Sequence, residues 1–208
     1  MGHKYIPDEQ KENVTSLDPV NGWDTFTRWL AKPPKKAKTV VVDTISGLYE
    51  LCFHATCAKN NWKHPSDGAH GKGWSEVKRA MFDALGRLTH ICASMNATLI
   101  FIDHSKIETI ETATSNLEKI TCAMPGQARN IVLPIPDHIW LLGYDSSDAK
   151  DSLHATTAKR CLYVGGNAAV EAGCRDPKVR VKVITPLSKN KPYEQIVKEL
   201  YAKEKDNE

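Results

Sequence analysis

The sequence has no apolar run long enough to cross a bilayer, and its first ten residues are too polar for a secretory signal. None of its six cysteines form a C-x-x-C pair, and several lie in apolar patterns, where a reduced thiol packs as a small hydrophobic side chain. Neither sign of charge dominates, since 28 basic and 25 acidic residues leave a formal net charge of +3. These absences indicate a cytoplasmic protein with reduced thiols, and they neither require nor exclude a polyanionic partner.

The chain also lacks the phosphate-binding pattern G-x-x-x-x-G-K-[ST], in which backbone N–H groups cradle phosphate and the hydroxyl reaches Mg²⁺. The nearest approach is the segment Gly68–Gly73, but Ser66 stands at the first glycine position and Gly73 replaces the hydroxyl residue. We therefore expect this segment to be a flexible, basic, glycine-rich surface loop.

What the sequence does have is a short β-branched run, Thr39–Val42, that ends in the carboxylate of Asp43. A helical pattern over Ile45–Lys59 follows it, with apolar side chains on one face. A second apolar run, Ala97–Ile102, ends in Asp103. Strand–helix–strand alternation of this kind predicts buried parallel strands in an α/β sheet.

The remaining elements are predicted from periodicity and turn residues. We expect a helix over 25–31 capped by Asp24, a long helix from Ser75 to Asn96, a mobile polar excursion over 107–121, a helical turn over 128–133, strands over 138–144, 160–164 and 179–185, a polar loop over 145–154 and a helix over 193–203. The 208 residues suit one domain. We expect an irregular lead-in over 1–21, a single domain over 22–203 and a disordered tail over 204–208.

Asp43 and Thr44 are the first candidates for chemistry. An Asp at the end of a parallel strand lies where open α/β sheets bind ligands, and it is suited to hold Mg²⁺ beside phosphates. The alternative is that Asp43 only caps the next helix. His104 lies just past the second strand, where it is either a ligand-contacting residue or a surface histidine.

Two other metal sites are conceivable. His54, Cys57, His64 and His70 match no strong zinc spacing. Carboxylates and imidazoles at Asp43, Asp103–His104 and Asp137–His138 suggest a two-metal phosphoesterase. However, Asp137 precedes its strand, which places it at the opposite edge if the strands are parallel.

Several segments together resemble phage RecA-like AAA-type ATPases of the single-strand-annealing and recombination group. The matching segments are Gly22–Asp24, Thr39–Thr44 with Leu48–Tyr49, Gly71–Trp74, Leu99–Lys106, Met124–Ile131 running into Asp137–Trp140, and Glu171–Arg175. Each motif is weak alone, but their order and spacing together are specific.

The resemblance implies a RecA-like P-loop NTPase sheet with flanking helices and a C-terminal antiparallel extension. It implies ATP and Mg²⁺ as cofactors, single-stranded DNA as partner, a homo-oligomer without membrane contact, and the cytoplasm of a bacterial host as location. Asp43 would be the catalytic, metal-holding Asp of the Walker B strand, and His104 the second catalytic residue, which senses the γ-phosphate. Thr44 and Arg129 would complete the nucleotide contacts.

The departure from the family is the missing first strand, phosphate loop and helix. We therefore expect a protein truncated before the Asp43 strand, since loss of that unit leaves a hydrophobic strand edge unpaired. The alternative is a non-catalytic DNA-binding or assembly protein that retains the fold. A metal-dependent phosphoesterase is the third hypothesis.

Overall fold

The computed structural model describes residues 14–111, 115–144 and 159–201, and it divides into two compact units. The first unit comprises Met1–Asp103 with Met124–Ile131, and the second comprises His104–Ala123 with Val132–Glu208. The predicted polar loop over 145–154 and the tail over 204–208 lie outside the described residues. Within the described part of the chain, no helix combines the length and the apolar character needed to span a membrane.

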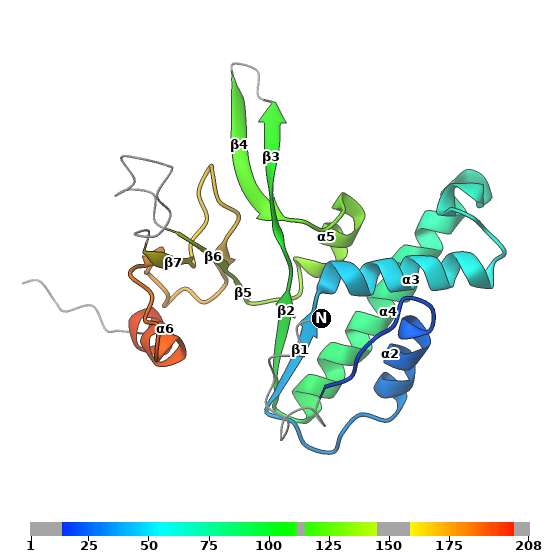
Figure 1. Ribbon diagram of the computed structural model, residues 1–208, viewed down its shortest axis with the longest axis horizontal. Helices are drawn as coiled ribbons and strands as arrows, with labels where there is room; N and C mark the ends of the chain where they lie inside the picture. Colours follow the sequence, from blue (N-terminus) through cyan, green and yellow to red (C-terminus); the bar gives the residue numbers. More distant parts are fainter. Residues whose placement is uncertain (1–13, 112–114, 145–158, 202–208) are drawn as a thin grey trace, which may run out of the picture. The chain divides into compact units, whose positions relative to one another are not determined.

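The first unit places helices against a two-stranded parallel sheet (Figure 1). Its elements are α2 (Gly22–Ala31), β1 (Thr39–Asp43), α3 (Ile45–Lys59), the short 3₁₀ helices η2 (Pro65–Asp67) and η3 (Ala69–Gly71), α4 (Lys72–Ser94), β2 (Thr98–Ile102) and α5 (Gly126–Val132). Strands β1 and β2 run parallel, with Thr39 opposite Thr98 and Asp43 opposite Ile102. The predicted strand–helix–strand order and parallel pairing are confirmed.

The core of this unit forms where α4 packs against α2 and α3. The apolar residues that recur at three- and four-residue spacing along α4 are at most 5% exposed, and they are Val77, Met81, Ala84, Leu85, Leu88 and Cys92. Leu48 and Cys52 of α3 are similarly buried. The sequence periodicity therefore predicted the buried faces of these helices correctly.

The prediction that both strands are buried is wrong for one face of the sheet. Val41 is 51% exposed, Ile100 41% and Ile102 42%. Their side chains alternate with those of Val40, Val42 and Phe101, which are partly buried on the other face. Helices α3 and α4 contact these strands, and among the described residues they cover that second face only partly.

Two helix starts differ from their predicted positions. Helix α2 begins at Gly22, so Asp24 lies inside its first turn instead of capping it. The carboxylate of Asp18 accepts hydrogen bonds from the backbone N–H groups of Val20 (2.9 Å) and Asn21 (2.7 Å) just before the helix. Helix α4 begins at Lys72, three residues before the predicted start at Ser75, because the glycine-rich segment already turns into helix there.

The predicted mobile excursion over 107–121 is wrong, because most of it forms an antiparallel hairpin in the second unit. Strands β3 (Ser105–Glu111) and β4 (Asn116–Cys122) pair with Ile107 opposite Ile120 and Ile110 opposite Leu117. Glu108 lies opposite Lys119, a register in which opposite charges on facing strand positions are favourable. The polar residues that suggested a loop do not all face solvent, since Thr121 is 3% exposed and Glu108 is partly buried, whereas Ile107 is 67% exposed.

The rest of the second unit is antiparallel, as predicted, but its described strands form sheets of their own and do not extend β1–β2. The predicted strand over 138–144 divides into β5 (His138–Ile139), which pairs with β8 (Gly173–Cys174), and β6 (Leu141–Tyr144). Strands β6, β7 (Arg160–Tyr163) and β9 (Val183–Ile184) form the second sheet, and α6 (Pro192–Leu200) follows. Their core comprises Leu162, Val164, Ile184, Leu187, Ile196 and Leu200.

The six cysteines are reduced, and we expect their thiols to react in two groups. Cys52, Cys57, Cys92 and Cys161 are buried, whereas Cys122 and Cys174 are partly exposed. Burial raises the pKa of the Cys52 thiol to about 12, so this thiol stays protonated and unreactive near pH 8. Titration with Ellman's reagent should label Cys122 and Cys174 in the native protein and the other four only after unfolding. Fast native labelling of Cys52 would contradict the buried α3–α4 contact.

Candidate functional site

Two carboxylates lie at the carboxyl edge of the β1–β2 sheet. Asp43 is the last residue of β1, and Asp103 directly follows β2. Because the strands are parallel and Asp43 pairs with Ile102, both acidic residues belong to the same edge. This is the edge at which open α/β sheets bind their ligands.

Asp103 is fully engaged within the protein. The hydroxyl of Ser46 donates a hydrogen bond to Asp103 Oδ1 at 2.6 Å, and the backbone N–H of Met124 donates to Oδ2 at 3.1 Å. Ser46 lies in the first turn of α3, and Met124 precedes α5. Asp103 therefore fastens the start of α3 and the approach to α5 to the end of β2.

Asp43 has the opposite character. Its side chain is exposed, and within the described residues it makes no hydrogen bond or ion pair. The next residue, Thr44, caps α3, because its Oγ1 accepts a hydrogen bond from the backbone N–H of Gly47 at 3.2 Å. The alternative that Asp43 caps the helix is therefore wrong, and its carboxylate is left available to a ligand.

Replacing Asp103 with Asn should destabilise the protein. An amide has one acceptor oxygen, so either Ser46 or Met124 loses its acceptor in Asp103→Asn. We expect the free energy of unfolding to fall by about 1–3 kcal/mol, the usual cost of an unsatisfied, partly buried donor. Ser46→Ala should cost about 1 kcal/mol, since it removes one bond and leaves the other. Urea unfolding of the full chain measures both; equal stability of Asp103→Asn and the unsubstituted protein would contradict the fastening role.

The glycines of the Gly68–Gly73 segment allow close packing. A Cβ on Gly73 would lie 2.1 Å from the carbonyl oxygen of Pro65, and a Cβ on Gly68 would lie 2.6 Å from the backbone nitrogen of Gly73. The start of α4 therefore sits directly against η2, where only glycine fits. This packing explains Gly68 and Gly73 without a bound phosphate, and Gly71 has the positive φ (+74°) that favours glycine.

The histidines near this segment form aromatic contacts. The ring of Phe53 lies 5.6 Å from that of His64 and 5.8 Å from that of Trp74, measured between centroids. His64 Nδ1 accepts a hydrogen bond from the backbone N–H of Ser66, which caps η2. Within the described ranges no three His, Cys, Asp or Glu side chains form a metal-binding group, so the structure gives the zinc hypothesis no support.

The other predicted site residues are placed differently. His104 is exposed and begins the second unit, and its carbonyl accepts a hydrogen bond from Ala123 N–H at 2.8 Å. Arg129 lies on α5 in the first unit and is partly buried. Asp137 precedes β5 in the second unit and forms an ion pair with Arg175 at 3.8 Å. The structure thus brings Asp43 and Thr44 together with Ser46 and Asp103.

Ser46 is the site residue that sequence reasoning missed. Its hydrogen bond with Asp103 joins residues that are 57 positions apart, and no local sequence pattern predicts such a pair. The one available signal was that each of the two strands is followed by polar residues.

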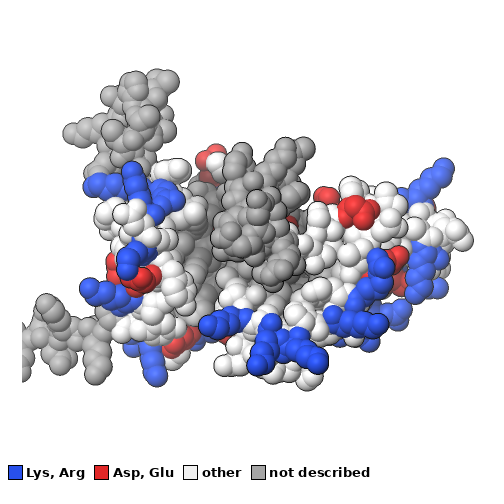
Figure 2. All heavy atoms as spheres, turned by 60° about the horizontal axis from the view of Figure 1, so that its bottom comes forward, with Lys and Arg blue, Asp and Glu red and all other residues white. Residues whose placement is uncertain are grey.

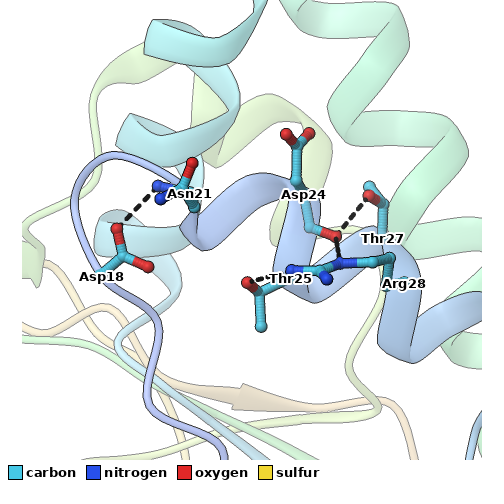
Figure 3. Close-up of a pocket in the computed structure, with 6 residues that line it drawn as sticks. All are labelled: Asp18, Asn21, Asp24, Thr25, Thr27 and Arg28. Carbon is cyan, nitrogen blue, oxygen red and sulfur yellow. Dashed lines mark hydrogen bonds between the residues drawn. The ribbon is translucent and has the colours of Figure 1, made fainter.

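A separate surface hollow lies at the start of α2 and includes none of the predicted site residues (Figure 3). Its volume is about 640 Å³, and it is lined by Asp18, Asn21, Asp24, Thr25, Thr27 and Arg28. The hydrogen bond from the backbone N–H of Asn21 lowers the pKa of Asp18. The Arg28 guanidinium donates hydrogen bonds to Thr25 Oγ1 (3.1 Å) and to the Asp24 carbonyl (3.3 Å). Figure 3 shows the Asp24 carboxylate directed away from Arg28. The polar groups of this hollow thus form hydrogen bonds mostly with α2 itself and with the turn before it.

Comparison with protein families gives a match over residues 2–175 to the family described as AAA domain. The chain belongs to this AAA domain family. The match covers most of the chain, including both acidic residues at the β1–β2 edge, and it ends before β9 and α6. A nucleotide-binding, ATPase-like function follows from the family. No curated protein and no solved structure matches the chain.

Proposed function

We propose that this AAA domain binds MgATP at the carboxyl edge of β1–β2, with Asp43 facing the metal ion. The observation that carries the proposal is the contrast between the two carboxylates of this edge. Asp103 has both oxygens occupied by Ser46 and Met124, whereas Asp43 is exposed and has no partner among the described residues.

The donor set at this edge suits magnesium. Mg²⁺ commonly keeps several waters and takes one or two carboxylates together with phosphate oxygens. A single uncommitted Asp therefore fits, and a cage of three protein ligands is not needed. When bound, the ion would neutralise phosphate charge, and Asp43 would orient the ion. Thr44 follows Asp43 in the chain and carries a hydroxyl.

His104 and Arg129 have proposed supporting roles. His104 is the residue after Asp103, and we assign it to sensing the γ-phosphate. Arg129 lies in α5, which Met124 precedes, and we assign it to the nucleotide or to a neighbouring subunit of a homo-oligomer. Both assignments rest on the resemblance to RecA-like ATPases.

The polymer on which this ATPase-like domain acts is proposed to be single-stranded DNA, in phage recombination or replication. The resemblance to the single-strand-annealing group supports this choice. Calorimetry with MgATP, repeated with ATP and EDTA, tests the nucleotide part, and anisotropy with a labelled oligodeoxythymidine tests the DNA part. Micromolar binding that requires Mg²⁺ is expected; a folded chain that binds neither ligand would refute the proposal.

A second candidate is a DNA-binding AAA domain that does not turn over nucleotide. The packing of Gly73 against Pro65 favours it, because the glycine-rich segment is then committed to structure and offers no cradle for a triphosphate. Measuring phosphate release with and without oligodeoxythymidine separates the two candidates. Turnover that depends on Mg²⁺ supports the first, and DNA binding without turnover supports the second.

A further inference from the structure

The segment that joins α2 to β1 is the most basic stretch of the first unit. It carries four lysines, Lys32, Lys35, Lys36 and Lys38, and no acidic residue occurs between Asp24 and Asp43. All four side chains are exposed, and none forms a hydrogen bond or ion pair with a described residue. Figure 2 turns the bottom of Figure 1 forward, and Lys and Arg side chains gather along its lower part with few acidic atoms among them. The positive charge of this segment is therefore not neutralised by its described neighbours.

Both ends of the segment are fixed to the fold. The backbone N–H of Lys32 donates to the carbonyls of Arg28 and Trp29 at 3.1 Å each, which ends α2. The carbonyl of Lys38 accepts a hydrogen bond from Thr98 N–H at 2.9 Å, which joins it to the start of β2. Pro33 and Pro34 restrict the backbone between them. The lysines are thus presented from a constrained loop, and a ligand need not order it fully.

We propose that the segment Lys32–Lys38 is a contact surface for the sugar–phosphate backbone of single-stranded nucleic acid. Lysines without acidic partners bind phosphates by releasing counterions, which requires no base sequence. Trp29 is partly exposed one helical turn before Lys32, and an indole face beside cations is suited to stack on an unpaired base. This inference rests on the DNA partner of the proposed function and assigns it a surface.

A membrane surface fits these residues less well. Between Val20 and Val41 the described chain has no fully exposed large hydrophobic side chain, and Trp29 is only partly exposed, so the segment offers one aromatic ring and no apolar face to insert among acyl chains. Exposed lysines that attract phosphate, together with an aromatic ring that can stack on a base, favour a flexible nucleic-acid strand as the ligand.

The surface is separate from the proposed nucleotide site. Lys38 adjoins the amino ends of β1 and β2, whereas Asp43 lies at their carboxyl edge. Five strand residues separate the two ends by about 15 Å. Loss of the lysines should therefore leave MgATP binding unchanged.

The test compares two triple variants of the full chain with equal loss of charge. Lys35→Gln/Lys36→Gln/Lys38→Gln removes three of the segment's four cations. Lys59→Gln/Lys63→Gln/Lys78→Gln removes three exposed lysines outside the segment, at the end of α3, just after it and in α4. Binding to labelled oligodeoxythymidine is measured by anisotropy across a salt series. Each phosphate contact on a single strand contributes about −0.7 to the slope of log K against log salt, so the segment variant should lose about 2 from the slope. At about 50 mM salt we expect at least tenfold weaker binding, with the control within about twofold.

The outcomes separate this inference from the proposed function. If the unsubstituted chain binds no oligonucleotide, the DNA partner and this surface both fail. If it binds and the segment variant binds equally well, or if both variants weaken equally, the surface assignment alone is wrong. Sedimentation with vesicles of phosphatidylserine and phosphatidylcholine is the last arm. Vesicle binding that depends on the segment, without an effect on oligonucleotide binding, would overturn the nucleic-acid assignment.

Discussion

Asp43→Asn is expected to weaken MgATP binding by about 10- to 100-fold while leaving the fold intact. The substitution removes the negative charge of the Asp43 side chain, which faces solvent and has no partner among the described residues. A neutral amide keeps the shape but binds Mg²⁺ far less strongly than a carboxylate. Because nothing in the described fold depends on this carboxylate, the free energy of unfolding should change by less than about 0.5 kcal/mol.

The matched control is Asp24→Asn, which removes an exposed carboxylate from α2 in the same unit. Its MgATP affinity should equal that of the unsubstituted chain. Calorimetry gives the affinities, and urea unfolding gives the stabilities. Undiminished binding by Asp43→Asn, or an equal loss in the two variants, would show that the carboxyl edge of β1 does not hold the metal.

Gly73→Ala should be strongly destabilising. The added Cβ would lie 2.1 Å from the carbonyl oxygen and 2.7 Å from the carbonyl carbon of Pro65, so backbone must move. We expect the free energy of unfolding to fall by about 1–3 kcal/mol or more, as for overpacking elsewhere. An unchanged free energy of unfolding in Gly73→Ala would contradict a packing role for the glycine-rich segment.

Gly86→Ala provides the opposite control on the same helix. Gly86 lies inside α4, and a Cβ there meets no heavy atom within 4 Å. This change should therefore stabilise the protein by about 0.5–1 kcal/mol through helix propensity. Urea unfolding measures both variants. If Gly73→Ala were neutral for stability but removed MgATP binding, the segment would be a phosphate site after all.

Local regularity explains which elements could be predicted. The run Thr39–Asp43 and the helix Ile45–Lys59 were located from β-branched composition and helical period, and the structure confirms both. The β3–β4 hairpin was missed because its threonines, glutamates and lysines look like loop composition, and because its burial does not follow an apolar–polar alternation. The open face of β1–β2 was missed because a continuous apolar run is the same whether one or both faces are covered.

The candidate site was predictable only in part. Asp43 was identified because a strand visibly ends in it, but the sequence cannot tell an engaged carboxylate from an available one. That distinction comes from Ser46 and Met124, whose contacts with Asp103 span 57 and 21 positions. Tertiary structure, and not the motif, assigns the two acidic residues different roles.

The most direct test of the central claim is to locate the metal. Mn²⁺ in place of Mg²⁺, added with ATP, broadens the amide NMR signals of nearby residues. We expect broadening centred on the amides of Thr44–Gly47, and its absence in Asp43→Asn. Broadening centred on Gly68–Gly73, or on Asp18 and Asp24, would contradict the assignment of the nucleotide site to the carboxyl edge of β1 and β2.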